Sequence, residues 1–120
     1  MRVVLDTNIL VRANAKTSGP ARRLLLSVAA PPHTLLLSSF LLDETERVLA
    51  YPRLRSRWRL SQRDVEEHIE FLYRVSELVH AGPIRSVVSE DPYDDAVVQT
   101  AVDGRADKLC TLDNHFMSRR

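Results

Sequence analysis

The chain has 120 residues, of which 44% are hydrophobic and 28% are charged, and its net charge is +1, which fits one globular domain. No apolar run approaches the roughly 20 residues that cross a bilayer, and no secretory signal opens the chain, so neither a membrane protein nor a secreted one is expected. A single cysteine, Cys110, excludes an internal disulfide and a cysteine zinc cage, which makes the reducing cytoplasm the expected location. Three glycines are too few to form either of the common phosphate-binding glycine motifs.

Short apolar runs alternate with longer amphipathic segments, which is the pattern of an α/β domain. We expect strands at Val3–Leu5, Thr34–Leu37, Ile84–Val88 and Lys108–Leu112, of which the third is weak. Helices are expected from Gly19-Pro20 to the stop at Pro31-Pro32, from about Phe40 to Leu49, from the capping box Ser61–Asp64 as far as Val79, and from Tyr93 to Val102. Ser38-Ser39 offers a cap for the second of these helices. Strands separated by helices pair in parallel, so we predict a small doubly wound sheet of about four to five parallel strands in a Rossmann-like three-layer arrangement.

Two carboxylates directly follow predicted strands, Asp6 after the first and Asp113 after the last. In an open parallel sheet, functional sites form in the crevice beyond the carboxyl ends of the strands. We therefore expect both acids at the same edge of the sheet. A helix cap or a loop acid is the alternative explanation for either one alone.

Glu44 lies on the apolar stripe of its predicted helix, four residues after Phe40. Asp43, Glu46 and Arg47 are expected to point elsewhere. A charged carboxylate on a core-facing stripe is unfavourable unless it is paired or bound to a metal. Glu44 is therefore a metal ligand, one partner of a buried salt bridge, or a side chain that extends from the stripe to reach solvent.

The run from Asp91 to Asp95 opens the last predicted helix. Pro92 fits the first helical position, which makes Asp91 the cap and Asp94 a first-turn acid that the helix dipole favours. Asp95 has no such structural explanation. We therefore select Asp95 as the residue that takes part in the chemistry of the site and keep Asp94 as the alternative.

Four converging carboxylates repel one another unless a cation or protons neutralise them. Oxygen ligands suit hard divalent ions, so Mg²⁺ or Mn²⁺ is expected and zinc is not. The four histidines form no spacing that is typical of metal sites.

Four segments resemble, in order, the motifs of the PIN-domain nucleases: Val3–Leu10, Leu41–Leu49 with Glu44, Asp91–Asp95, and Ala106–Asp113. The resemblance covers nearly the whole chain. It implies a PIN-like fold and a metal-dependent endoribonuclease that hydrolyses RNA phosphodiester bonds, most often the toxin of a VapC-type toxin–antitoxin pair. It also implies Mg²⁺ or Mn²⁺ as cofactor, a cognate antitoxin as partner, and a homodimer.

Carried over position by position, the resemblance implies particular roles for seven residues. The catalytic and metal-binding acids are Asp6, Glu44, Asp95 and Asp113, and the residues that orient them by hydrogen bonds are Thr7, Asn8 and Thr111. Only seven residues follow Asp113, whereas the family continues into a further strand. We therefore expect one PIN-like domain over residues 1–120, with that last strand either absent or supplied by a neighbour.

An arginine-rich stretch surrounds the single tryptophan and is expected to be a loop or a frayed helix. Arginine binds phosphate through two hydrogen bonds and an aromatic ring stacks on unpaired bases. The stretch is thus a candidate RNA contact, formed by Arg53, Arg55, Arg57, Arg59 and Trp58. The alternative is a solvated segment whose tryptophan packs in the core or at a dimer contact.

Two other functions stay open. A non-catalytic nucleic-acid-binding or regulatory interaction domain would keep the fold, and metal titration followed by RNA cleavage distinguishes it from the enzyme. A phosphoacceptor signalling domain also gathers acids at the carboxyl edge, but it requires an early acidic pair, whereas Asp6 stands alone. Phosphate transfer from acetyl phosphate tests that function.

Overall fold

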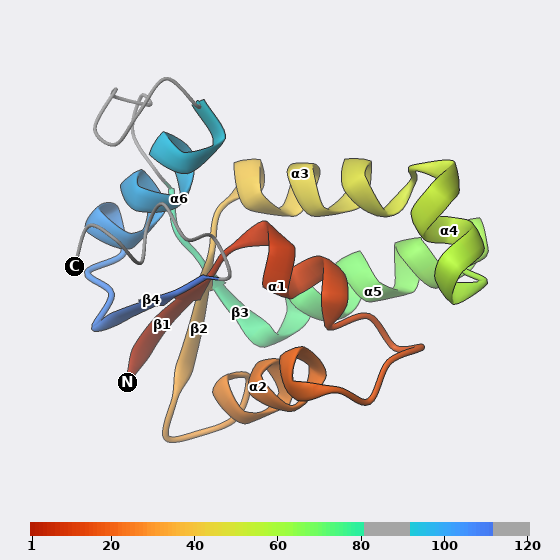
Figure 1. The fold of residues 1–120 in the computed structure, drawn as a ribbon. Helices are drawn as coiled ribbons and strands as arrows, with labels where there is room; N and C mark the ends of the chain where they lie inside the picture. Colours follow the sequence, from red (N-terminus) through yellow and green to blue (C-terminus); the bar gives the residue numbers. More distant parts are fainter. Residues whose placement is uncertain (81–91, 112–120) are drawn as a thin grey trace.

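The computed structural model describes residues 1–80 and 92–111, and of residues 92–95 it describes the backbone (Figure 1). The strands are β1 (Arg2–Leu5), β2 (Thr34–Leu37), β3 (Ser76–Leu78) and β4 (Lys108–Cys110). The helices are α1 (Thr7–Arg12), α2 (Pro20–Val28), α3 (Ser39–Leu49), α4 (Pro52–Trp58), α5 (Gln62–Val75) and α6 (Pro92–Asp103). The strand predicted at Ile84–Val88 lies outside the described residues.

The four described strands form one parallel sheet in the order β3-β2-β1-β4. In its register, Val4 lies opposite Leu36 of β2 and Leu109 of β4. The predicted parallel α/β sheet is therefore confirmed. Because all strands run the same way, the residues that follow β1, β2 and β4 lie at one edge of the sheet.

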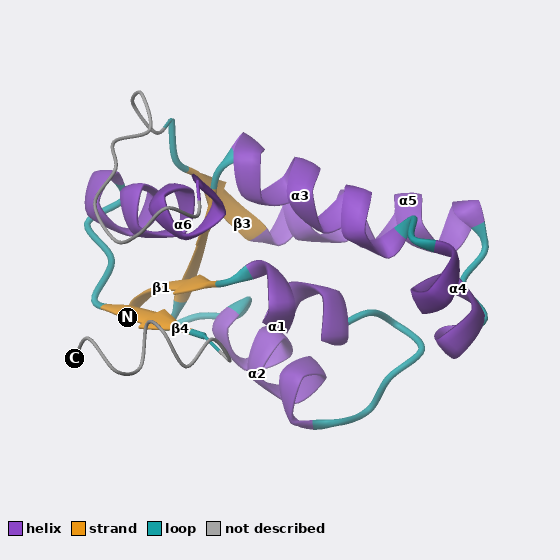
Figure 2. Ribbon diagram, turned by 45° about the horizontal axis from the view of Figure 1, so that its top comes forward, coloured by secondary structure: helices purple, strands orange, loops and turns teal. Residues whose placement is uncertain are grey.

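Helices cover both faces of the sheet (Figure 1). On one side α6 packs against β1, β2 and β4, while α1, α2 and α5 lie on the other. Helix α3 packs against α1 and α5, and α4 follows at its far end, away from the sheet, in both views (Figure 2). The result is the predicted three-layer arrangement.

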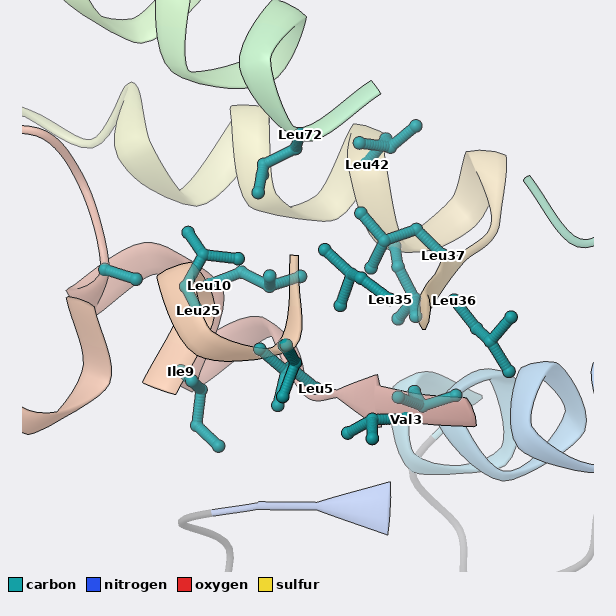
Figure 3. Close-up of a cluster of buried hydrophobic side chains, with 14 of the residues drawn as sticks. Val3, Leu5, Ile9, Leu10, Leu25, Leu35, Leu36, Leu37, Leu42 and Leu72 are labelled. Carbon is teal, nitrogen blue, oxygen red and sulfur yellow. The ribbon is translucent and has the colours of Figure 1, made fainter. Parts of the chain in front are cut away.

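The core explains why the two central strands read as uninterrupted apolar runs. Both faces of the sheet are covered, so the last three side chains of β1 and of β2 are all buried. Figure 3 shows leucines from sheet and helices gathered in one cluster, and several of them have no exposed surface, among them Leu5, Leu10, Leu25, Leu35 and Leu72.

Most predicted helix ends are confirmed. Ser38 caps α3, and its hydroxyl accepts a hydrogen bond from the backbone N–H of Leu41. Ser61 and Asp64 form the reciprocal capping box that opens α5. Pro20 occupies the first turn of α2, as the Gly-Pro pair indicates. Proline and capping side chains therefore mark helix ends well in this chain.

One helix was not predicted, and the predicted end of another was wrong. The segment after β1 forms the six-residue helix α1, which is too short to show a clear helical period. Helix α5 ends at Val75 instead of continuing to Val79, because Ser76 turns to an extended conformation and starts β3, which pairs with β2. Val79 continues the helical spacing of apolar residues, but pairing with the sheet overrides that local pattern.

Arg2 ties together the amino ends of the strands. Its guanidinium pairs with Glu77 of β3 and donates two hydrogen bonds to the carbonyl oxygen of Gly104, at 3.0 and 2.9 Å. The hydrogen bond from Arg2 lowers the pKa of the Glu77 carboxyl. The backbone N–H of Arg2 donates to the Asp107 carboxylate, and the backbone N–H of Asp107 donates to the carbonyl oxygen of Arg2. The turn between α6 and β4 is thereby fixed to β1 and β3.

His68 is a buried polar residue on α5, with 4% of its surface exposed. Its Nε2 lies 3.0 Å from the carbonyl oxygen of Leu10, which fixes α5 against α1. Burial, with a smaller contribution from the charge of Arg22, lowers the pKa of the imidazole below its ordinary value. His68 is therefore packed as the neutral ring.

Among the described residues, no helix combines the length and the apolar character that crossing a membrane requires.

We predict that Gly104→Ala lowers the free energy of unfolding by about 1–3 kcal/mol, as for other overpacked core sites. The new Cβ would lie 2.8 Å from Val79 Cγ2 and 3.0 Å from the carbonyl oxygen of Thr100. Urea denaturation measures the change. Gly19→Ala is the matched control, since a Cβ there meets no atom within 4 Å. Equal stability of the two variants would contradict the close packing around Gly104.

We predict that His68 makes the protein less stable as the pH falls from about 7.5 to 5.5. The pKa of His68 is lower in the folded than in the unfolded chain, so the unfolded chain takes up the proton first. The stability contributed by the neutral ring is complete above the unfolded pKa and is lost below it. His68→Gln keeps a donor for the Leu10 carbonyl without titrating, so urea denaturation across this range should show a shallower decline. A parallel decline in both proteins would contradict the prediction.

Candidate active site

Asp6 is the first residue after β1, and only 1% of its surface is exposed. Its Oδ1 accepts a hydrogen bond from the backbone N–H of Ile9 at 3.0 Å, so Asp6 is the N-cap of α1. Its Oδ2 accepts a hydrogen bond from the hydroxyl of Thr111, and its backbone N–H donates to the carbonyl oxygen of Cys110. Asp6 therefore caps a helix, as its alternative explanation required, and it also lies at the predicted edge of the sheet.

Thr111 shows how the strands bring distant residues together. Leu5 and Cys110 are paired in the register of β1 and β4, so the residues that follow them, Asp6 and Thr111, meet at the carboxyl edge. In this contact the hydroxyl of Thr111 donates to the Asp6 carboxylate, while the predicted role of Thr111 in orienting the acids of the site stays a prediction. Asp113 lies outside the described residues.

A second polar contact at this edge was not found from the sequence. Ser38 follows β2, and its hydroxyl oxygen is 2.8 Å from that of Thr100 on α6, with a hydrogen bond between them. Both residues are buried. The bond joins the start of α3 to α6. The sequence identifies Ser38 as a helix cap, but nothing in it indicates Thr100 as the partner.

Glu44 lies on α3 with 13% of its side chain exposed. The guanidinium of Arg47 donates to Glu44 Oε1 through Nε, at 2.7 Å, and through Nη2. This hydrogen-bonded carboxylate raises the pKa of Arg47. Arg47 is exposed, as are Asp43 and Glu46, so these residues point away from the apolar stripe as predicted. Residues three apart still share a helix face, so the long Arg47 side chain reaches back to Glu44. Glu44 therefore forms a salt bridge, but not the buried one that was its alternative explanation, because 64% of the Arg47 side chain is exposed.

The Glu44–Arg47 pair lines a pocket of about 300 Å³ together with Phe40 and Asp43. All four of these residues belong to α3, so the pocket is bordered by two carboxylates and one guanidinium of this helix. The pocket therefore leaves Glu44 accessible although most of its side chain is covered.

The acids predicted on the last helix lie on α6, which contacts β1, β2 and α3. Asp94 and Asp95 are in its first turn, and the described residues do not include their side chains. The backbone position of Asp95 is fixed by the buried Ala96 and Val97 and by Thr100. The choice between Asp94 and Asp95 stays a prediction.

Thr7 and Asn8 open α1 directly after Asp6. Thr7 is buried and Asn8 is exposed. Their predicted role in orienting the carboxylates stays a prediction.

The arginine-rich stretch forms α4, at the end of α3 away from the sheet (Figure 2). Arg53 and Arg57 are exposed, whereas Arg55 is half-buried and donates to Gln62 at 2.7 Å. Trp58 packs against a small apolar cluster. The guanidinium carbon of Arg57 lies over the indole ring, 6.0 Å from its centre. The packing alternative for Trp58 is therefore present, next to exposed guanidinium groups. Both Arg57 and Trp58 also line a larger pocket, of about 530 Å³.

The sequence model of the PIN domain family matches residues 2–115 of the chain. The chain belongs to the PIN domain family. A search of curated proteins finds no match.

Two solved structures share the fold of this PIN domain. The toxin VapC20 of Mycobacterium tuberculosis, which cleaves the sarcin–ricin loop, is 18% identical, with a TM-score of 0.68 over 98% of this chain and 94% of that chain. VapBC2 of Rickettsia felis, solved with a DNA fragment from its promoter, is 16% identical, with a TM-score of 0.61 over 94% of this chain and 100% of that chain. At these identities the likeness concerns the fold, and it agrees with the predicted PIN-like architecture.

The oxygen donors of this PIN domain suit a hard divalent ion. Asp6 is a carboxylate fixed by two hydrogen bonds, and Glu44 is a carboxylate that opens into a pocket. Among the side chains that the structure describes, in residues 1–80 and 96–111, no three histidine, cysteine, aspartate or glutamate residues gather closely enough to hold a metal. A complete ligand set would thus require side chains beyond those described, such as Asp95 and Asp113.

Proposed function

We propose that this PIN domain is a divalent-metal-dependent endoribonuclease and the toxin component of a toxin–antitoxin pair. The observation that carries the proposal is the buried Asp6 carboxylate, fixed at the carboxyl edge of the sheet by Thr111. The membership of a nuclease family and the shared fold with VapC20 and VapBC2 support it. The alternative of a non-catalytic binding domain has no comparable observation in its favour.

Four acids would hold the ion, namely Asp6, Glu44, Asp95 and Asp113, with Asp94 as an alternative to its neighbour. When bound, Mg²⁺ or Mn²⁺ supplies activation of water and neutralises charge that develops on the phosphate. This chemistry requires no nucleophilic side chain from the protein.

The residues of the chain provide the preorganisation that such a site needs. Asp6 cannot rotate freely, because one oxygen is bound by the N–H of Ile9 and the other by Thr111. A ligand fixed in this way loses little conformational entropy when it binds an ion. We propose that Thr7 and Asn8, next along the chain, complete the polar surroundings of Asp6.

The proposed partners follow from the same family. VapBC2 is a complex of toxin and antitoxin, so we propose a cognate antitoxin for this chain as well, together with a homodimer and a cytoplasmic location. RNA is the proposed substrate, and the exposed arginines of α4 are a proposed contact for its phosphates.

We predict that Asp6→Asn and Glu44→Gln each reduce metal-dependent cleavage of RNA by about 100-fold or more. Even residues that only support a metal ligand typically contribute about 10- to 100-fold. Asparagine is as good an N-cap as aspartate, so Asp6→Asn should keep α1. Cleavage of a labelled RNA with Mn²⁺ or Mg²⁺ measures the loss, and circular dichroism confirms folding.

The matched control is Glu46→Gln, which removes an exposed carboxylate from the same helix. It should cleave RNA like the unchanged protein. Full cleavage by the folded Asp6→Asn or Glu44→Gln protein would remove that residue from the proposed site.

We predict that the double variant Arg53→Gln, Arg57→Gln binds single-stranded RNA more weakly and with a shallower salt dependence. Each lost phosphate contact lowers the slope of log K against log salt by about 0.7. Fluorescence anisotropy with EDTA present measures binding without cleavage. Arg23→Gln, Arg74→Gln removes the same charge from α2 and α5 and is the control. The same slope in both double variants would exclude α4 as a specific RNA contact.

A further inference from the structure

We propose that Arg47 is an internal counter-ion of Glu44 that competes with the divalent cation, so that the site takes up its ion by exchanging a guanidinium for a metal. The inference rests on the proposed function, because it takes Glu44 as a ligand of that ion. It adds a positioning residue from the chain itself to the four acids.

The bonding pattern is the first observation. Both Nε and Nη2 of Arg47 donate to the same oxygen, Oε1 of Glu44. A guanidinium usually binds a carboxylate in a fork, with one N–H on each oxygen. Here the pair uses one oxygen only, and Oε2 accepts no hydrogen bond from the described residues. Half of the carboxylate therefore stays available in the pocket.

The second observation is the unequal burial of the two partners. Glu44 is 13% exposed, whereas Arg47 is 64% exposed. The Glu44 side chain is therefore largely covered, whereas most of the Arg47 side chain lies in solvent. An ion pair with one well-solvated partner contributes little and is screened by salt. Arg47 can thus leave Glu44 without exposing apolar surface.

The third observation is that both partners line the same pocket of about 300 Å³. Arg47 therefore borders the same space in which a cation would bind Glu44. Asp43 lines the pocket as well and lies four residues before Arg47, a spacing at which a helix pairs opposite charges. It offers the displaced guanidinium another acceptor one helical turn away.

The experiment is a Mn²⁺ titration of the full chain, followed by calorimetry or by the loss of the free-ion signal in electron paramagnetic resonance, at about physiological ionic strength. Arg47→Gln should bind Mn²⁺ about three- to fivefold more tightly than the unchanged protein, because the competitor is gone. Arg47→Lys keeps the charge and should stay within about twofold of the unchanged protein. Unchanged or weaker binding by Arg47→Gln would overturn the inference, as would an absence of Mn²⁺ binding in every protein.

Two further variants distinguish the loss of the Arg47–Glu44 contact from a general effect of removing a positive charge. Arg74→Gln removes another exposed arginine that is paired with a glutamate of its own helix, Glu70, and should leave the affinity unchanged. In the Glu44→Gln background, Arg47→Gln should have no effect, since the two residues act through one contact. An equal gain in affinity with and without Glu44 would contradict the proposed exchange.

The proposed function can fail independently. If Arg47→Gln tightens Mn²⁺ binding through Glu44 but the loaded proteins cleave no RNA, the nuclease function fails and the counter-ion role stands. If the unchanged protein cleaves RNA in a Glu44-dependent manner and Arg47→Gln binds Mn²⁺ no more tightly, the counter-ion role alone fails.

Discussion

Burial of the Asp6 carboxylate at 1% exposure is unfavourable unless hydrogen bonds replace the lost water. The N–H of Ile9 and the hydroxyl of Thr111 replace it, and they come from α1 and from the end of β4. One side chain thus requires a helix to begin where β1 ends and requires β4 to lie beside β1. The arrangement of the carboxyl edge depends on both requirements.

The fold could be predicted where local signals and the sheet agree. The apolar runs of β1 and β2 are confirmed, because strands buried on both faces need apolar residues in succession. The capping box at Ser61 is confirmed, because the unpaired N–H groups of the first helical turn are satisfied by side chains close in sequence. The end of α5 was misplaced, since Val79 fits a helical period and only pairing with β2 makes Ser76–Leu78 a strand. Helix α1 was missed because its six residues show no clear period.

The candidate site was predictable to the extent that it follows strand ends. Asp6 lies at the carboxyl edge because it follows a strand, and Thr111 reaches it through the register of β1 and β4. The bond between Ser38 and Thr100 depends on how α6 packs on the sheet, which no local spacing encodes. The contact of Arg47 with Glu44 depends on a flexible side chain, for which backbone direction is a poor guide.

The bond between Ser38 and Thr100 joins two uncharged hydroxyl groups in a buried place. Dissolved ions screen exposed charges but leave such a bond nearly untouched. The exposed Arg47–Glu44 pair is the opposite case, because its attraction falls as ionic strength rises. Concentrated salt therefore changes the electric field inside the small pocket while the scaffold around it keeps its shape. The attraction between Arg47 and Glu44 thus depends on ionic strength, whereas the buried bond between Ser38 and Thr100 does not.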